Sequence, residues 1–357
     1  MPNLINHLFF RAKLGPNSIA VQALHHQLTF AQLLLSVQII AAKLRQAGIR
    51  PGQIVVTSLP DKYLDWVVTL ALFHEATITC SNHGYAPLDA TLAYNWVITD
   101  RPTAPFPADK TICIDTDWLT DVKNVSHKIN HHDYDSPTCP VRLILTSGTT
   151  GNRKAVALSS EQIIARIKSQ AGYFGSYSTV SLMQISTVAG INNAVNSLIT
   201  GTPLYCFSSQ GEIAGLLAKY SIACLYGSPV QLAGLVGEVA KNKQSLPALK
   251  IVRYTGGLAS PTLLKKIATH LCAHIVSVYG STEVSGACLF NPTPDTQSSV
   301  AGYLFPDAQL EIVDELHEPL LQGEEGLIRV KTPYMVHEYY KNQIGRASCR
   351  ERVCQYV

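Results

Sequence analysis

Residues 143–154 read Leu-Ile-Leu-Thr-Ser-Gly-Thr-Thr-Gly-Asn-Arg-Lys. An apolar, strand-like run passes directly into a loop that is rich in hydroxyl groups and ends in a lysine. Gly148 and Gly151 allow backbone turns and a close approach that a Cβ atom would block. The hydroxyl donors of the loop are Thr146, Ser147, Thr149 and Thr150. Together with the movable charge of Lys154, they predict a cradle for the phosphates of a nucleotide.

The spacing in this loop differs from that of the NTPase P-loop. A P-loop has four residues between its glycines and a lysine directly after the second glycine. Here two residues separate Gly148 from Gly151, and two more precede Lys154. The pattern therefore disfavours ATP hydrolysis of the P-loop type. Taken alone, the stretch has one alternative interpretation, a plain polar turn after a strand.

The loop resembles the phosphate loop of the adenylate-forming superfamily, which includes acyl-CoA synthetases, nonribosomal-peptide adenylation domains and luciferases. The superfamily loop reads Thr-Ser-Gly-Thr-Thr-Gly-x-Pro-Lys, and here only the proline is replaced, by Arg153. The resemblance implies that residues 146–151 bind the phosphates of ATP. It also implies that Lys154 both binds nucleotide and takes part in catalysis.

A second motif, Tyr279-Gly280-Ser281-Thr282-Glu283, follows the apolar run at residues 275–278. It is similar to the superfamily's Tyr-Gly-x-Thr-Glu at the end of a strand. The resemblance implies that Tyr279 lies against adenine, with Gly280 and Ser281 in the same nucleotide site. It further implies that the Thr282 hydroxyl meets the α-phosphate and that Glu283 binds Mg²⁺, which makes both catalytic. A glutamate on a loop is more often simply solvated, but a carboxylate suits a hard cation that bridges phosphate oxygens.

Between these motifs, a short strand opens into a turn formed by Gly256, Gly257 and Leu258. This turn resembles the superfamily's loop against the adenine and the acyl pocket, which implies a nucleotide-binding role for its three residues. Ser260 and Pro261 then predict the start of a helix.

The segment expected to contact the acid substrate comprises Thr187, Val188, Ala189 and Gly190. It looks like the place where many acyl-CoA synthetases carry an aromatic residue or histidine before a small residue and glycine, and Thr187 occupies that place here. Amino-acid-activating relatives carry an aspartate nearby that pairs with the substrate's ammonium, whereas residues 178–200 contain no aspartate. Because an unpaired buried ammonium is costly, the sequence favours a carboxylic acid without an α-amino group.

The composition is that of a well-buried globular protein, since 46% of the 357 residues are hydrophobic and 15% are charged. Lys and Arg exceed Asp and Glu by only three, 28 against 25, which gives no reason to expect nucleic acid as a partner. We find no apolar run long enough for a membrane span and no secretory signal, so we expect a cytoplasmic protein. The scattered cysteines fit reduced core residues, and the histidines lack the spacing of a zinc site.

Strand-like and helix-like segments alternate along most of the chain, which predicts an α/β fold. Residues 29–47, for example, form a predicted helix whose capping box consists of Thr29 and Gln32. From about residue 300 the pattern changes to strands joined by turns. The resemblance covers residues 1–343 and implies the large N-terminal core of adenylate-forming enzymes. We expect two α/β subdomains and a small β-barrel-like subdomain at about residues 300–343.

The last matches to the superfamily are residues 326–331, similar to its Gly-Glu-Leu/Ile strand, and Tyr339-Tyr340, similar to its Gly-Tyr segment. Glu338 stands where glycine is usual. Residues 344–357 break the pattern and resemble a translated sequencing adapter, so we expect a non-native tail, with a solvated basic tail as the alternative. We also expect this chain to lack the superfamily's C-terminal lid domain and therefore to be inactive in thioester formation.

Three functions follow as hypotheses. The first is ATP-dependent and Mg²⁺-dependent activation of a small carboxylic acid as acyl-adenylate, for transfer to coenzyme A or to the phosphopantetheine thiol of a carrier protein. The second is an amino-acid adenylation domain of a nonribosomal peptide synthetase. The third, from another class, is a nucleotide-binding module without turnover.

Overall fold

The computed structural model describes residues 3–82, 84–88, 92–115, 118, 131–146, 154–174, 177–295, 300–336 and 339–340. The chain divides into two compact units. The first consists of Met1–Ile164 and Gln184–Ser208, and the second of Ala165–Met183 and Ser209–Val357. Within the described residues, no helix combines the length and the apolar character needed to span a membrane.

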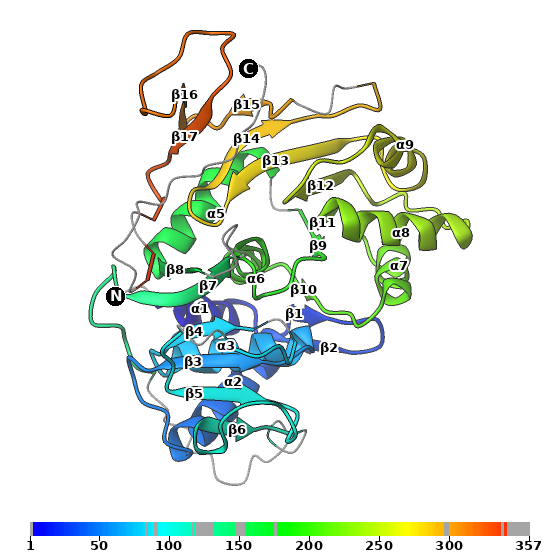
Figure 1. The fold of residues 1–357 in the computed structure, drawn as a ribbon. Helices are drawn as coiled ribbons and strands as arrows, with labels where there is room; N and C mark the ends of the chain where they lie inside the picture. The colour runs from blue at the N-terminus through cyan, green and yellow to red at the C-terminus, as the bar shows by residue number, and fades with distance from the viewer. Residues whose placement is uncertain are drawn as a thin grey trace. The chain divides into compact units, whose positions relative to one another are not determined.

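The first unit is built on a sheet with the strand order β6-β5-β3-β4-β7-β8 (Figure 1). Its bounds are β3 (Ile54–Ser58), β4 (Ile78–Ser81), β5 (Trp96–Thr99), β6 (Thr111–Cys113), β7 (Pro140–Thr146) and β8 (Lys154–Ser159). Neighbouring strands run parallel except β8, which is antiparallel to β7. Strand β3 is buried along its whole length, as expected for a central strand of a mostly parallel sheet.

Helices and a small second sheet complete the first unit. They are α1 (Ile5–Leu14), α2 (Phe30–Gln46), α3 (Lys62–His74), the 3₁₀ turn η1 (Ala108–Lys110) and α6 (Val188–Thr200), with strands β1 (Ile19–Gln22), β2 (Gln27–Thr29) and β10 (Leu204–Tyr205). Helix α3 packs against β3 and β4, and α2 packs against α1 and α3. The predicted capping box is confirmed, because the Gln32 amide donates to Thr29 Oγ1 at 3.2 Å and the Thr29 amide donates to Gln32 Oε1 at 2.9 Å.

The second unit contains a sheet with the strand order β15-β14-β13-β12-β11-β9. Its bounds are β9 (Thr179–Ser181), β11 (Cys224–Gly227), β12 (Ile251–Thr255), β13 (Ile275–Ser281), β14 (Ser285–Phe290) and β15 (Tyr303–Leu304). Strands β9, β11, β12 and β13 are parallel, and β14 and β15 follow as antiparallel neighbours. The alternating α/β pattern is thus confirmed in both units.

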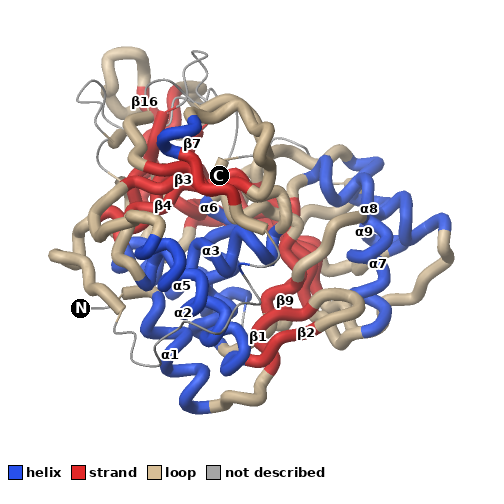
Figure 2. Tube along the Cα trace, turned by 90° about the horizontal axis from the view of Figure 1, so that it is seen from below, coloured by secondary structure: helices blue, strands red, loops and turns tan. Residues whose placement is uncertain are grey.

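The helices of the second unit are α7 (Gln210–Lys219), α8 (Pro229–Lys241) and α9 (Pro261–His270), together with most of α5 (Ser160–Phe174). Helix α8 packs against both α7 and α9, and the three lie side by side in Figure 2. The predicted helix start is confirmed, because Ser260 Oγ accepts from the Leu263 amide at 3.2 Å and Pro261 is the first helical residue.

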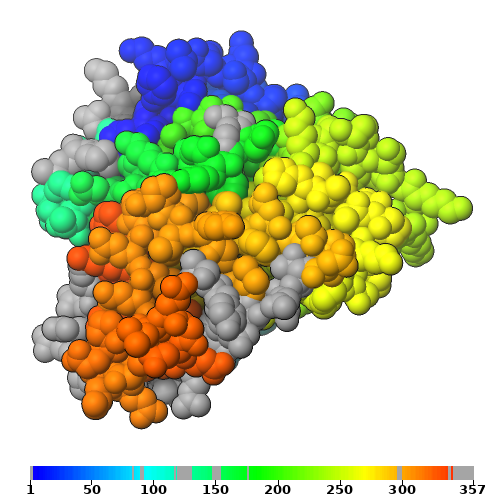
Figure 3. Space-filling model, turned by 90° about the horizontal axis from the view of Figure 1, so that it is seen from above, coloured from blue at the N-terminus to red at the C-terminus, as the bar shows by residue number. Residues whose placement is uncertain are grey.

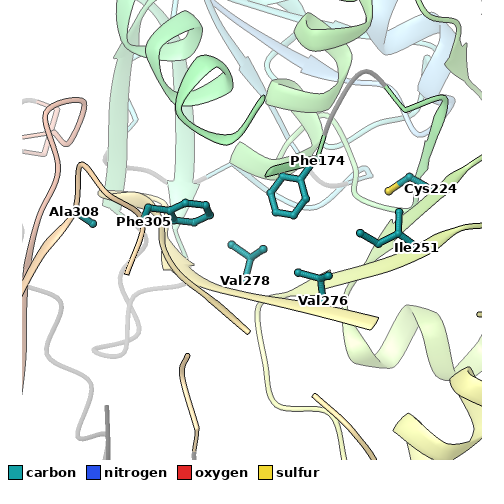
Figure 4. Packing of buried hydrophobic residues seen from close by; sticks show 7 residues of the cluster. All are labelled: Phe174, Cys224, Ile251, Val276, Val278, Phe305 and Ala308. Atoms are coloured by element: carbon teal, nitrogen blue, oxygen red, sulfur yellow. The ribbon is translucent and has the colours of Figure 1, made fainter. Parts of the chain in front are cut away.

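A hydrophobic cluster joins α5 to the sheet of the second unit (Figure 4). It is formed by the buried side chains of Phe174, Cys224, Ile251, Val276, Val278, Phe305 and Ala308. These come from α5, β11, β12, β13 and the segment after β15, so the cluster fixes α5 over the strand that carries the second motif.

The last described part of the chain contains β16 (Gln309–Val313) and β17 (Leu327–Lys331), which pair antiparallel. This hairpin lies on the surface, where it is drawn in orange in Figure 3, and Leu316 and Leu321 in its loop are largely exposed. Strand β15, also beyond residue 300, pairs with β14 and so belongs to the larger sheet. The small β-barrel-like subdomain remains a prediction, and the expected foreign tail lies outside the described residues.

Two strand boundaries differ from expectation at the motifs. The strand predicted at residues 275–278 continues through Ser281, because Gly280 and Ser281 pair with Gly286 and Ser285 of β14. Lys154 does not stand in a free loop but begins β8, a strand that the sequence analysis missed. The second motif therefore lies at the turn of a β-hairpin, and the first is flanked by the antiparallel strands β7 and β8.

Candidate functional site

The predicted phosphate loop connects β7 to β8 in the first unit. Thr146 is the last residue of β7 and faces Lys154, the first residue of β8, across the ladder. The Thr146 hydroxyl donates to the Lys154 carbonyl at 3.2 Å. The predicted residues between them, Ser147, Gly148, Thr149, Thr150 and Gly151, lie outside the described residues. The structure therefore describes the two ends of the loop, where Thr146 of β7 pairs with Lys154 of β8.

A buried polar network, which the sequence analysis missed, supports β7. The fully buried Arg142 donates to Thr79 Oγ1 at 3.2 Å, to Ser81 Oγ at 2.8 Å and to the Ile185 carbonyl at 2.8 Å. Ser81 Oγ in turn donates to Asp65 Oδ1 at 3.1 Å. Burial raises the pKa of Asp65, and the nearby Arg142 opposes that shift. The network thus links the strand before the phosphate loop to the segment before Thr187.

The sequence does contain a signal for this network. Arg142 is the single charge inside the otherwise apolar strand 140–146. Charged side chains are almost never fully buried unless they are paired, so an isolated charge in an apolar run indicates a buried partner.

The predicted acid-binding segment begins helix α6. The Thr187 hydroxyl accepts from the Gly190 amide at 3.1 Å and donates to the Gln184 carbonyl at 2.8 Å, so it caps the helix. A Cβ atom at Gly190 would lie 1.8 Å from the Gln184 oxygen, which explains the glycine. Val188 and Ala189 form the partly exposed first turn. The structure therefore gives Thr187 and Gly190 a local structural task, and their contact with substrate remains a prediction.

The predicted adenine loop follows β12 in the second unit. Gly256 has a φ of +80°, a conformation that favours glycine, and Leu258 is 69% exposed. Because β11, β12 and β13 are parallel, their carboxyl ends meet at one edge of the sheet. The turn formed by Gly256 and Gly257 thus lies at the same edge as Tyr279, and ligands of α/β sheets bind at such edges.

The second motif forms the tight turn between β13 and β14. A Cβ atom at Gly280 would lie 1.9 Å from the Ser285 carbonyl oxygen, so only glycine fits this position. Tyr279, Gly280 and Ser281 belong to β13, and Thr282 and Glu283 lie in the turn that follows it. The structure thus brings all five predicted residues of the motif together at the end of the sheet.

Arg166 of α5, a fully buried residue that the sequence analysis missed, holds this turn through its backbone. Its Nη1 donates to the Thr282 carbonyl at 2.9 Å and its Nη2 to the Glu283 carbonyl at 2.8 Å. Its Nε and Nη2 also donate to the Tyr334 carbonyl at 3.2 and 3.1 Å. Burial lowers the pKa of Arg166 to about 10, with Tyr334 and Glu283 opposing the shift, so the guanidinium stays charged at neutral pH.

The carboxylate of Glu283 contacts Tyr339, a residue for which the sequence predicted no role in the site. Tyr339 donates its phenolic hydroxyl to Glu283 Oε1 at 2.9 Å. Within the described residues, no group of three or more His, Cys, Asp and Glu side chains could enclose a metal ion. Mg²⁺ does not require such a group, because it is commonly held by one or two carboxylates, substrate phosphates and water. The single carboxylate at this turn fits that chemistry.

The comparisons with known proteins identify the family of this chain. The family described as AMP-binding enzyme matches residues 8–340, so the chain belongs to the AMP-binding enzyme family, the adenylate-forming, AMP-forming ligases. Enterobactin synthase component E of Escherichia coli (strain K12) is 23% identical over 372 residues, covering 93% of this chain and 68% of the relative. The 4-chlorobenzoate–CoA ligase of Arthrobacter sp. is 23% identical over 289 residues, which are 75% of this chain but 55% of the relative.

Solved structures confirm the fold. O-succinylbenzoate coenzyme A synthetase (MenE) from Bacillus subtilis, in complex with ATP and magnesium ion, superposes with a TM-score of 0.79 at 20% identity, covering 96% of this chain and 73% of that one. VinN in complex with L-aspartate gives a TM-score of 0.80 at 20% identity, covering 96% of this chain and 92% of that one. These likenesses establish the α/β core of adenylate-forming enzymes.

Proposed function

We propose that this chain belongs to an enzyme that uses ATP to activate a carboxylic acid without an α-amino group. A carboxylate oxygen attacks the α-phosphorus, the bond from that phosphorus to pyrophosphate breaks, and an acyl-adenylate forms. A thiol of coenzyme A or of a carrier protein then attacks the acyl carbon and releases AMP. The observation that carries the proposal is the turn between β13 and β14, where Arg166 and Tyr339 hold Glu283 in place.

The proposal gives Glu283, Thr282 and Lys154 separate roles in binding the metal and the phosphates. Glu283 holds Mg²⁺, which when bound neutralises charge on the phosphates. The Thr282 hydroxyl meets the α-phosphate, and Lys154 reaches the departing pyrophosphate. Because such a reaction involves little covalent participation of the protein, positioning and electrostatic stabilisation provide most of its catalysis.

The nucleotide is supported by the solved structure of a relative that contains ATP and magnesium ion. The class of acid is supported by the lack of aspartate at residues 178–200. The amino-acid alternative also has support, since VinN was solved with L-aspartate. An ATP–pyrophosphate exchange assay with fatty, aromatic and amino acids separates the two. We expect exchange with a fatty or aromatic acid, and exchange with amino acids alone would refute the assignment.

Lys154→Ala is expected to weaken ATP binding by about tenfold and to leave AMP binding nearly unchanged, because the charge acts on the β- and γ-phosphates. Isothermal titration of both nucleotides measures the two affinities. Lys13→Ala, which removes an exposed lysine in α1, is the charge-matched control. Equal losses of ATP and AMP affinity would show that Lys154 lies elsewhere in the site.

A further inference from the structure

The turn that carries Glu283 is hydrogen-bonded to a segment near the end of the described chain. We call residues 332–336 and 339 the strap. Thr332 Oγ1 donates to the Val284 carbonyl at 3.0 Å, and the Val336 amide donates to the Glu283 carbonyl at 3.0 Å. The strap thus binds the turn over two successive residues.

Arg166 also joins the strap to the turn. Its guanidinium donates to the Thr282 and Glu283 carbonyls and also to the Tyr334 carbonyl of the strap. Every backbone carbonyl from Thr282 to Val284 therefore accepts a hydrogen bond from Arg166 or the strap. A turn that is held at three successive carbonyls has little freedom to change the backbone direction from which it presents the Glu283 side chain.

Tyr339 contacts the side-chain carboxylate of Glu283, whereas Arg166 and residues 332–336 bind the backbone of the turn. The Tyr339 side chain is 8% exposed, and its hydroxyl lies 2.9 Å from Glu283 Oε1. An ionised carboxylate is acceptor only, with two oxygens that share about four lone-pair positions. A donor fixed at Oε1 therefore sets the rotation of the carboxylate and determines where Oε2 is presented.

We propose that Tyr339 is a positioning residue that orients the Glu283 carboxylate toward the metal of the nucleotide complex. The proposal rests on the proposed function, in which Glu283 holds Mg²⁺. Hydrogen bonds to metal-ligating carboxylates orient the ligand and are worth about 10- to 100-fold in metal affinity. The strap then has a second role besides packing, because it carries the group that prepares the metal site.

The test measures how strongly Mg²⁺ increases the affinity for a nucleotide that cannot react. The probe is the α,β-methylene analogue of ATP, titrated by calorimetry with excess Mg²⁺ and again with EDTA. The ratio of the two dissociation constants reports the coupling between metal and nucleotide. An unfolded fraction of a variant lowers the active concentration equally in both titrations, so the ratio remains interpretable.

Tyr339→Phe removes only the hydroxyl and is expected to reduce this ratio by about tenfold. Tyr334→Phe is the matched control, because its hydroxyl contacts Asp307 at 3.4 Å while its backbone carbonyl still binds Arg166. We expect the control to keep the ratio within about twofold of the unmodified protein.

Glu283→Gln separates failure of this inference from failure of the proposed function. If Glu283→Gln abolishes the Mg²⁺ effect and Tyr339→Phe leaves it intact, Tyr339 is not a positioning residue and the proposed function stands. If Glu283→Gln itself retains the effect, Glu283 is not the metal ligand and both assignments are wrong. A Tyr339→Phe variant that loses affinity equally with and without Mg²⁺ would also contradict the positioning role.

Discussion

Glu283→Ala is expected to slow Mg²⁺-dependent ATP–pyrophosphate exchange by about 100-fold, a loss of about 3 kcal/mol of transition-state stabilisation. The reason is that the carboxylate held by Tyr339 is the proposed metal ligand, and no other acidic side chain of residues 279–285 can replace it. The measurement is the exchange rate as a function of Mg²⁺ concentration, with acid and ATP at saturation.

Glu315→Ala serves as the control for this prediction, because Glu315 is an exposed carboxylate in the loop after β16 of the same unit. The control is expected to leave the Mg²⁺ dependence unchanged. If Glu283→Ala exchanges pyrophosphate at the unmodified rate and at the same Mg²⁺ concentration, Glu283 has no place in the site.

Arg166→Met is expected to lower the free energy of unfolding by about 3 kcal/mol, because it removes the charged donor from the carbonyls of Thr282 and Tyr334. The Glu283 carbonyl keeps its hydrogen bond from the Val336 amide. The guanidinium donates hydrogen bonds to the carbonyls of Thr282, Glu283 and Tyr334. Methionine fills a similar volume but has no hydrogen-bond donor in its side chain. Urea unfolding, with the midpoint and slope compared between variants, measures the loss.

Lys168→Met is the matched control on the same helix, since Lys168 is exposed and the substitution removes the same charge. Surface substitutions of this kind usually change stability by less than about 0.5 kcal/mol. An Arg166→Met protein as stable as the Lys168→Met protein would mean that the hydrogen bonds of Arg166 do not hold the turn.

Local features of the fold could be predicted because they depend on residues that are close in sequence. The capping box of α2 depends on Thr29 and Gln32, three positions apart, and the helix start at Pro261 depends on its neighbour Ser260. The alternation of apolar strands and helices likewise gave the α/β class. Such patterns are dictated by periodicity and by the backbone needs of helix ends.

The parts of the site that could not be predicted depend on contacts between distant residues. Arg166 lies 116 positions from Thr282 and 168 from Tyr334, and it stands in a helix whose sequence shows nothing unusual at this position. The contact of Tyr339 with Glu283 spans 56 positions. Nor did the sequence show that Lys154 begins a strand, because the pairing of β8 depends on β7.

Acid-dependent ATP–pyrophosphate exchange by the protein encoded by the gene is the decisive measurement for the proposed function. The panel should contain fatty, aromatic and amino acids, each with Mg²⁺ and with EDTA. We expect Mg²⁺-dependent exchange with at least one fatty or aromatic acid and none with amino acids. Nucleotide binding without exchange for any acid, or exchange with amino acids only, would contradict the proposed function.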